Sequence, residues 1–212
     1  MSVTDTYMIQ NVQYALLENG NTDADGTTLL TSMFTMQEII DSFNRVQQKF
    51  LLETGMIVTR VSIPGVVGTS KYPTPADSIR PRRISWQDAG STPRVLTQVD
   101  TWELDNFEGN WGTDQGVPEV WWENTLGQQQ IAVALTPSNP GSIGLLYVAL
   151  ATTLTNAGVN FTVPDDWTPY IYWGTLNELL ESDGQSFDPV RAQYTSQRYE
   201  EGVELARLVL GG

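Results

Sequence analysis

The hydrophobic pattern of this 212-residue chain changes period twice, from helical to strand-like and back to helical. Before Gly55 and after Pro164, apolar residues recur at intervals of three and four, which is typical of amphipathic helices. Between these points, short β-branched and aromatic runs are bounded by turn residues, which is typical of strands. Helices so far apart in sequence must bury their apolar stripes together. The sequence therefore predicts an α+β fold, in which residues 1–55 and 164–212 form a four-helix bundle and residues 56–163 form a large, mainly β insertion.

The clearest helix follows Thr35, where Thr35 and Glu38 have the spacing of a capping box and Gly55 supplies an end. Caps are also available before the other helices. These are Thr4 or Asp5 for the first, Asp165, Asp166 or Thr168 for the third, and Asp188 followed by Pro189 for the last. The predicted helices span 6–18, 36–54, 168–182 and 189–209. The last helix has a predicted buried stripe of Ala192, Tyr199, Val203, Ala206 and Leu210.

The middle of the chain contains six short runs with strand character. They cover residues 56–63, 83–86, 95–99, 120–122, 131–135 and 145–150. Residues 101–106 are predicted to form a short helical turn. The segments 19–34 and 64–81 are predicted to be long loops, which in a compact domain are often functional or ordered by a partner.

Composition excludes several kinds of chemistry. The chain has no Cys and no His, so it has no disulfide, thiol nucleophile, thiolate metal site or imidazole base. Seven Trp, eight Tyr and six Phe indicate a folded protein. The N-terminus lacks the basic and apolar regions of a signal peptide, and no apolar run is long enough to span a bilayer. We therefore expect a soluble protein with no membrane partner.

Residues 21–26 have the ligand spacing of the first half of an EF-hand loop, including a glycine at the sixth position. Such a loop is closed by a carboxylate at the twelfth position, where this chain has Ser32. Asn, Asp and Gly are also ordinary turn residues. The sequence therefore predicts a turn without a calcium ion, and no metal ligands anywhere in the chain.

Aromatic residues beside carboxylates could indicate a sugar-binding or glycoside-cleaving protein. The adjacent Asp165 and Asp166 are better explained as a helix start, where acids stabilise the helix dipole. Glu119 and Glu123 flank two Trp residues, but on a strand they share one face and have no evident partner. The sequence therefore predicts no enzyme activity, with no catalytic and no cofactor-binding residues.

Charge is distributed unevenly along the chain, whose net charge is −14. No basic residue lies between Arg94 and Arg191. This stretch holds thirteen acids: Asp100, Glu103, Asp105, Glu108, Asp114, Glu119, Glu123, Asp165, Asp166, Glu178, Glu181, Asp183 and Asp188. The stretch could simply belong to an acidic, soluble protein. Alternatively, it could form a wall that repels an anion or a face that awaits a basic partner.

Four of the eleven basic residues are Arg80, Arg82, Arg83 and Arg94. They could contact phosphate, but the sequence has no helix-turn-helix or zinc-finger context, and its net charge repels duplex DNA. Pairing with the acidic middle of the same chain is the preferred interpretation. A contact between subunits comes next.

The order of the landmarks resembles the head-to-tail adaptor (connector) proteins of tailed bacteriophages, including tail tubular A-like adaptors. The resemblance spans most of the chain and is strongest after Pro81. It rests on these segments and residues: 81–84, 95–104, Trp111, 116–118, 131–137, 145–148, 163–166, Tyr170, Asp188, Ala192 and Tyr199. The chain departs from the usual pattern at Gly174, where small alanines are common, and in its acidic middle.

The resemblance implies a structural virion protein without catalytic residues or cofactors, located at the head-tail interface and assembled in the host cytoplasm. Its implied partners are the portal protein, tail or nozzle proteins, and other copies of itself in a dodecameric ring below the portal. Genomic DNA would pass through the ring without sequence-specific binding. The alternative is a carbohydrate- or receptor-binding phage surface protein, which requires exposed, coplanar Trp rings.

A channel for DNA gives the uneven charge a physical purpose, because an acidic wall repels phosphates and a basic wall would bind them. We expect Asp100–Glu123 to line this channel or a seam between subunits. Contacts in a ring join two different patches. The segment Arg80–Arg94 is therefore expected to meet the acidic segment of the neighbouring subunit.

Overall fold

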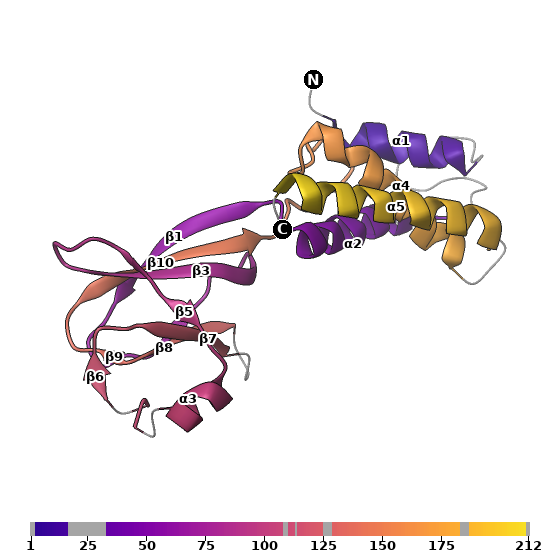
Figure 1. The fold of residues 1–212 in the computed structure, drawn as a ribbon. Coiled ribbons are helices and arrows are strands. Elements are labelled where there is room, and N and C mark those ends of the chain that lie inside the picture. The colour runs from indigo at the N-terminus through magenta and orange to yellow at the C-terminus, as the bar shows by residue number, and fades with distance from the viewer. Residues whose placement is uncertain are drawn as a thin grey trace. The chain divides into compact units, whose positions relative to one another are not determined.

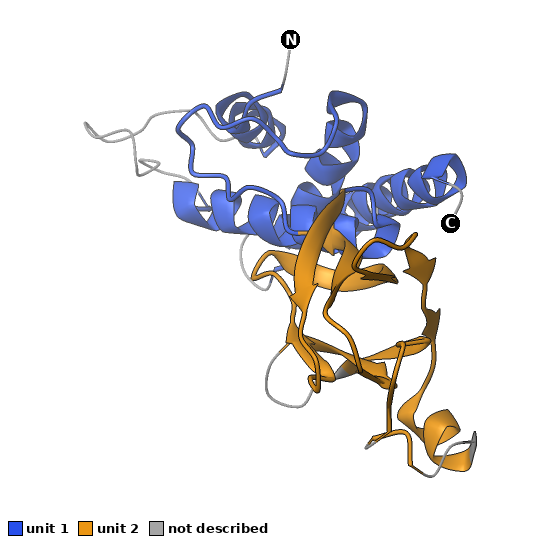
Figure 2. Ribbon diagram, turned by 90° about the vertical axis from the view of Figure 1, so that its left-hand side faces the viewer, with its two compact units in different colours: residues 1–57, 150–212 blue, residues 58–149 orange. Residues whose placement is uncertain are grey.

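The computed structural model describes residues 3–16, 33–107, 110–112, 114–124, 129–182 and 187–210. It contains two compact units, a helical unit of Met1–Ile57 with Leu150–Gly212 and a β unit of Val58–Ala149 (Figure 2). The α+β class is confirmed. The predicted insertion ended at residue 163, whereas residues 150–163 belong to the helical unit. Side chains of its second helix hold this segment: Asn44 Nδ2 donates to the carbonyl oxygen of Leu154 (3.1 Å), and Gln47 Nε2 to that of Thr152 (3.2 Å).

The helical unit is built from four α-helices and one 3₁₀ turn. They are α1 (Asp5–Ala15), α2 (Met36–Thr54), η1 (Asp165–Trp167), α4 (Thr168–Glu181) and α5 (Pro189–Leu210) (Figure 1). Helix α4 packs against both α2 and α5, and α1 contacts α2 and α4. The four predicted helices are therefore present, although α1 ends at Ala15 and not at residue 18.

Local capping chemistry explains where most of these helices begin and end. The amide of Glu38 donates to Thr35 Oγ1 (3.2 Å), and the amide of Thr35 donates to Glu38 Oε2 (2.7 Å), which confirms the capping box. Gly55 ends α2 with a φ of 62°, a conformation that favours glycine. At α5 the predicted cap is also confirmed, since the amide of Arg191 donates to Asp188 Oδ1 (3.1 Å).

The predicted side-chain cap of α4 is wrong. A 3₁₀ turn precedes this helix, and no side chain accepts a hydrogen bond from its first amides. The Thr168 hydroxyl instead donates to the carbonyl oxygen of Asp165 (2.8 Å). The Asp165 carboxylate accepts from the amide of Val3 (3.0 Å), so it holds the N-terminal segment in place of the helix start.

Close approach of the helices defines the core of the helical unit. Phe50 of α2 lies 6.2 Å from the Tyr199 ring of α5, measured between ring centroids. A Cβ atom added to Gly202 of α5 would lie 2.2 Å from the Tyr170 ring of α4, so only glycine permits this contact. The predicted stripe of α5 is buried except at Leu210, which is 40% exposed because it lies in the final turn, beyond these contacts.

Asp5 joins α1 to the segment that returns from the β unit. Its carboxylate is buried and accepts hydrogen bonds from the amides of Thr6 (2.6 Å), Thr155 (3.1 Å) and Gly158 (3.0 Å). Burial raises the pKa of this carboxyl, but the backbone hydrogen bonds outweigh burial and leave the pKa below its ordinary value. Asp5 therefore remains ionised and acts as a structural tether at neutral pH.

The β unit contains two four-stranded sheets, one two-stranded sheet and a short helix, α3 (Thr101–Phe107). The first sheet has the order β1 (Val58–Gly65), β10 (Gly141–Ala149), β3 (Ser78–Asp88) and β4 (Arg94–Val95). The second has the order β2 (Lys71–Pro73), β8 (Gln130–Ala134), β7 (Val120–Asn124) and β5 (Thr97–Gln98). Strands β6 (Gln115–Gly116) and β9 (Thr136–Pro137) form the third (Figure 1).

Side chains from both large sheets fill the core of the β unit. Trp86 of β3 is 1% exposed, and its indole N–H donates to Asp88 Oδ1 (2.9 Å). Strand β8 is buried on both faces. Its small residues, Ala132 and Ala134, pack with Trp122 and with Leu104 of α3. The large and small residues that alternate along β8 therefore fill two buried faces, not one buried and one exposed face.

Two predictions for the middle of the chain need correction. The predicted loop at 64–81 contains β2 and the start of β3, because Lys71–Pro73 pairs with β8 and several prolines obscure its strand character. The predicted strand at 95–99 is interrupted at Leu96: β4 pairs with β3 in one sheet, and β5 pairs with β7 in the other. The predicted helical turn at 101–106 is confirmed as α3.

Candidate interaction surfaces

The two units carry different charge. The helical unit has sixteen acids and five bases, a net charge of −11, whereas the β unit has nine acids and six bases, a net charge of −3. The acidic stretch is therefore divided: its acids from Asp100 to Glu123 belong to the β unit, and those from Asp165 to Asp188 to the helical unit. Within the β unit, seven of the nine acids lie between Asp100 and Glu123, whereas all six bases lie between Arg60 and Arg94.

The acids between Asp100 and Glu123 that the structure describes are all exposed. Three of them lie at α3, where Asp100 Oδ1 accepts from the amide of Trp102 (3.3 Å) and Asp105 Oδ1 accepts from the indole N–H of Trp111 (2.9 Å). Beside α3 is an open hollow of about 530 Å³. It is lined by Gln98, Val99, Asp100, Thr101, Glu103, Trp122 and Glu123. This surface is suited to repel anions.

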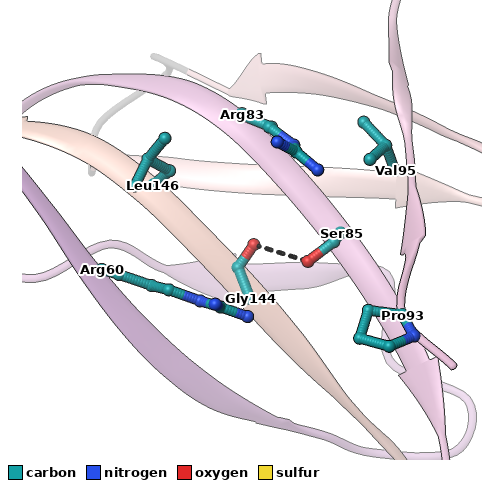
Figure 3. A pocket seen from close by; sticks show the side chains of 7 residues that line it. All are labelled: Arg60, Arg83, Ser85, Pro93, Val95, Gly144 and Leu146. Atoms are coloured by element: carbon teal, nitrogen blue, oxygen red, sulfur yellow. Dashed lines mark hydrogen bonds between the residues drawn. The ribbon is translucent and has the colours of Figure 1, made fainter.

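The basic residues of the β unit lie mainly on β1, β3 and β4. Arg60 of β1 and Arg83 of β3 are both paired in register with Leu146 of β10, so the three side chains form one row across the sheet. They line a groove of about 310 Å³ together with Ser85, Pro93, Val95 and Gly144 (Figure 3). The two guanidinium groups thus share one groove with apolar walls.

The floor of this groove depends on Gly144. A Cβ atom added there would lie 2.6 Å from Ser85 Oγ and 3.6 Å from a guanidinium nitrogen of Arg60, so it would occupy the space between them. The Ser85 hydroxyl donates to the carbonyl oxygen of Gly144 (3.3 Å), as Figure 3 shows. A missing side chain and two flanking arginines therefore form a hollow that can accept an anionic group.

The four predicted arginines have different surroundings. Arg94 pairs with Glu119 (3.4 Å), which confirms pairing with the acidic segment at this position and gives Glu119 the partner that sequence reasoning missed. Arg82 lies at a β-bulge, because Pro81 pairs with Tyr147 and Arg83 with Leu146. Within the described part of the chain, no carboxylate lies within 4.0 Å of the guanidinium groups of Arg60, Arg80, Arg82 or Arg83.

The family model described as SU10 adaptor protein matches residues 8–209 of this chain. The chain belongs to the SU10 adaptor protein family. This membership confirms the resemblance to head-to-tail adaptors and identifies a structural protein of the bacteriophage virion with a head-tail connector role.

Other comparisons add less to the identity of this adaptor. None of the curated proteins matches the chain. A similar solved structure is described as "Neck of empty GTA particle computed with C6 symmetry". Its sequence is 11% identical, its TM-score is 0.30, and the match covers 94% of this chain and 93% of that chain.

The tryptophans of the adaptor do not form a sugar-binding platform. Trp86, Trp121 and Trp122 are buried, and the Trp111 ring meets Trp122 edge to face with planes 85° apart. Trp111, Trp167 and Trp173 are half-buried, and Trp102 of α3 is the one tryptophan that is largely exposed, with 73% of its surface accessible. A stacking site for sugars needs several exposed, coplanar rings. The alternative of a carbohydrate-binding surface protein therefore lacks support from the seven Trp residues.

A second groove of about 390 Å³ lies in the helical unit, between α2, α4 and α5. The Lys49 ammonium is 5.1 Å from the centre of the Tyr199 ring, and the Tyr199 hydroxyl donates to Glu53 Oε2 (2.9 Å). Burial, followed by the Glu53 carboxylate, raises the pKa of Tyr199 far above its ordinary value. Tyr199 thus stays neutral and serves as a packing residue.

The structure shows no site for metal chemistry among the residues it describes, since no three acids there are grouped as ligands. The calcium-like segment 21–26 and Ser32 lie outside those residues. Asp165 and Asp166 are exposed at η1. In the same described ranges, none of the helices combines the length and apolar character needed to cross a membrane.

Sequence reasoning identified the exposed acids and Arg83, one of the two arginines of the groove, but missed Arg60 and Gly144. Arg60 lies more than twenty residues before Arg83 in the sequence and reaches it only because β10 pairs between their strands. The sequence signal was the alternation of Arg60 and Ser62 with the apolar Val61 and Ile63, which predicts that Arg60 lies on the exposed face of its strand.

Proposed function

We propose that this adaptor forms a ring, dodecameric as in the proteins it resembles, directly below the portal. The ring would pass the genome through its channel and dock tail or nozzle proteins on its far side. Subunits would be made in the host cytoplasm and incorporated there into the virion. The adaptor would act without catalysis or a cofactor. We also propose that α1, α2, α4 and α5 constitute the four-helix bundle of each subunit.

The observation that carries this proposal is the separation of charge within the β unit. Its described acids between Asp100 and Glu123 are exposed, and its arginines gather on β1, β3 and β4. A conduit for DNA must avoid binding phosphates, and an exposed acidic segment in which only Glu119 has a described basic partner, Arg94, meets this requirement. The acidic segment would line the channel or a seam between copies.

Family membership supports the ring because an adaptor that connects a head to a tail must match the rotational symmetry of its neighbours. In such a ring, each copy uses one patch to contact a different patch of the next copy. The arginine-bearing strands and the acidic segment are two such patches, with opposite charge. Their attraction would orient copies during assembly more than it would add affinity.

The test is to size the purified adaptor with and without purified portal rings by analytical ultracentrifugation. We expect a complex with the portal that contains one closed ring of adaptors. An unrelated acidic protein of similar mass and net charge serves as the control, because it reports binding through charge alone. No complex with the portal, or a complex equally formed by the control protein, would contradict the proposed function.

A further inference from the structure

The Arg60–Arg83 groove combines two features that point to a particular class of ligand. In the described part of the chain, no carboxylate lies within 4.0 Å of its two guanidinium groups, and its walls at Pro93, Val95 and Leu146 are apolar. Val95 is 55% exposed, so this wall is open to solvent. Guanidinium groups bind carboxylates and also stack on aromatic rings. The groove therefore fits a ligand that presents an aromatic ring next to a carboxylate.

Helix α3 of the same protein presents such a pair. Trp102 is 73% exposed, and the exposed Glu103 follows it about 100° further round the helix. The Glu103 carboxylate accepts a hydrogen bond from the amide of Asp100 (3.3 Å), and the buried Leu104 fixes the helix to the second sheet. Exposed Trp side chains are enriched at the centres of protein interfaces, because the ring contributes a large area at a small entropic cost. α3 is thus an anchored helix whose outer face is suited to enter a groove.

A copy of the chain does not place its own α3 in its own groove. Trp102 is exposed in the isolated subunit, and the groove is open in the same structure. Figure 1 shows α3 on the far side of β5 and β7 from strands β1, β10 and β3. Contact between these two surfaces therefore requires two copies, with the groove of one facing α3 of the other.

We propose that the Arg60–Arg83 groove is the receptor for α3 of the neighbouring copy. Trp102 packs against Val95 and Leu146, and Glu103 pairs with the two guanidinium groups over Gly144. This inference rests on the proposed ring and names its seam. The contact is heterologous, as ring closure requires, because the groove and α3 are different patches. It also explains why Gly144 leaves the space between the arginines empty.

The absence of cysteine makes a direct cross-linking test possible. Two single variants are mixed: Val95→Cys in the groove wall, and Asn106→Cys, which lies four residues after Trp102 on the same face of α3. We expect a disulfide-linked pair of the two chains in portal-bound rings. Val66→Cys mixed with Asn106→Cys is the matched control, because Val66 is also 55% exposed in the β unit but does not line the groove.

A charge-reversal experiment tests the same seam without cysteines. Arg83→Glu should lower ring assembly on the portal by about tenfold or more, as expected when an interfacial charge pair is made repulsive. Arg82→Glu, with the same charge change at the adjacent bulge residue, should have a much smaller effect because Arg82 does not line the groove. Adding Glu103→Arg to the Arg83→Glu chain should restore assembly in part. Circular dichroism checks that each variant folds.

The outcomes separate this inference from the proposed function. If rings form on the portal but the Val95 and Asn106 variants do not cross-link, or if Val66→Cys cross-links equally, the assigned seam is wrong while the ring stands. Equal effects of Arg82→Glu and Arg83→Glu would also overturn the groove. A cross-link from Val95→Cys to the portal instead of an adaptor would mean that the groove receives a different protein.

Discussion

The helical unit and the β unit differ in their net charge and in how their charged residues are distributed. The helical unit carries a net charge of −11 and has only five basic residues, of which Arg45 pairs with Glu178 and Arg198 pairs with Glu201. The β unit carries only −3, but its charges are separated into an acidic segment and an arginine face. Total charge and charge pattern are therefore independent. The β unit has the smaller net charge, but its separated charges are the pattern suited to binding a second copy.

The largest expected effect concerns Trp86, which holds the first sheet of the β unit together. Its ring leaves no space for a side chain at Gly65 or Gly141, where an added Cβ would lie 2.4 Å and 2.6 Å from ring atoms. Trp86→Ala should lower the free energy of unfolding of the β unit by about 3–5 kcal/mol, because it leaves a large cavity. Hydrogen exchange should show lost protection in β1, β3 and β10 and retained protection in α2 and α4.

Trp102→Ala is the control for this comparison of units, since the exposed Trp102 should contribute less than about 0.5 kcal/mol to stability. If Trp86→Ala removes protection from the helices as much as from the sheets, the two units unfold as one cooperative body. The distinction between them would then be geometric and not energetic.

The next effect belongs to the helical unit and to Asp5. Asp5→Asn should lower the free energy of unfolding by about 1.5–3 kcal/mol at neutral pH, because the carboxylate accepts hydrogen bonds as a charged group. The folded-state pKa lies below the ordinary value of 3.8, so the contribution is complete above that value and is lost as pH falls through the folded pKa. Urea unfolding at pH 7 and pH 3 should therefore show a smaller difference between variant and parent at pH 3.

Asp166→Asn provides the control for Asp5, because Asp166 is exposed at η1. Its effect on stability should be small at both pH values. A loss for Asp5→Asn that does not change with pH would mean that packing, not the charge of the carboxylate, is what Asp5 contributes.

A smaller loss in the free energy of unfolding is expected when a substitution pushes α4 and α5 apart. Gly202→Ala places a methyl group 2.2 Å from the Tyr170 ring, and overpacking of this kind costs about 1–3 kcal/mol. Alanine gains about 1 kcal/mol over glycine in a helix, which offsets part of the loss. Thermal unfolding should therefore show a net destabilisation, whereas Gln197→Ala on the exposed face of α5 should not be destabilising. A stabilised Gly202→Ala variant would show that the helices can separate freely.

The smallest effect should come from salt, and it compares the two units directly. Raising the ionic strength to about 0.1 M limits the reach of exposed charges to about 10 Å. Self-repulsion should fall more in the helical unit than in the β unit because of their net charges of −11 and −3. Hydrogen exchange at low and moderate salt should show that salt raises the free energy of opening by about 0.5 kcal/mol or less, and by more in α2 and α4 than in β3 and β10. An equal rise in both units would mean that the pattern of charge, and not the net charge, determines the response to salt.

The helices could be predicted because their signals are local. Thr35, Glu38 and Gly55 lie within one turn of the ends of α2, and its buried stripe repeats along a single helix. Where a cap depends on distant chain, prediction failed: Asp165 accepts a hydrogen bond from Val3 and so does not cap α4. Asp165 lies at the expected position before α4, but its carboxylate accepts a hydrogen bond from the amide of Val3, which is remote in sequence.

The β unit could be predicted as β but not as a set of sheets. Strand β1 pairs with β10, and β4 and β5 enter different sheets although only Leu96 separates them. Such pairings depend on register between distant segments, which periodicity does not contain. The groove was missed for the same reason, because its residues come from β1, β3, β10 and the segment around Val95.

Gly144 has a consequence for how this surface can evolve. A single substitution to any residue with a side chain would place carbon 2.6 Å from Ser85 Oγ and close the hollow between Arg60 and Arg83. One substitution at Gly144 is thus enough to remove the hollow. To form it again, a chain needs both a glycine at position 144 and a small residue at position 85. Adaptors that share this hollow should therefore keep the residues at 144 and 85 as a matched pair, and drift at one position should be accompanied by change at the other.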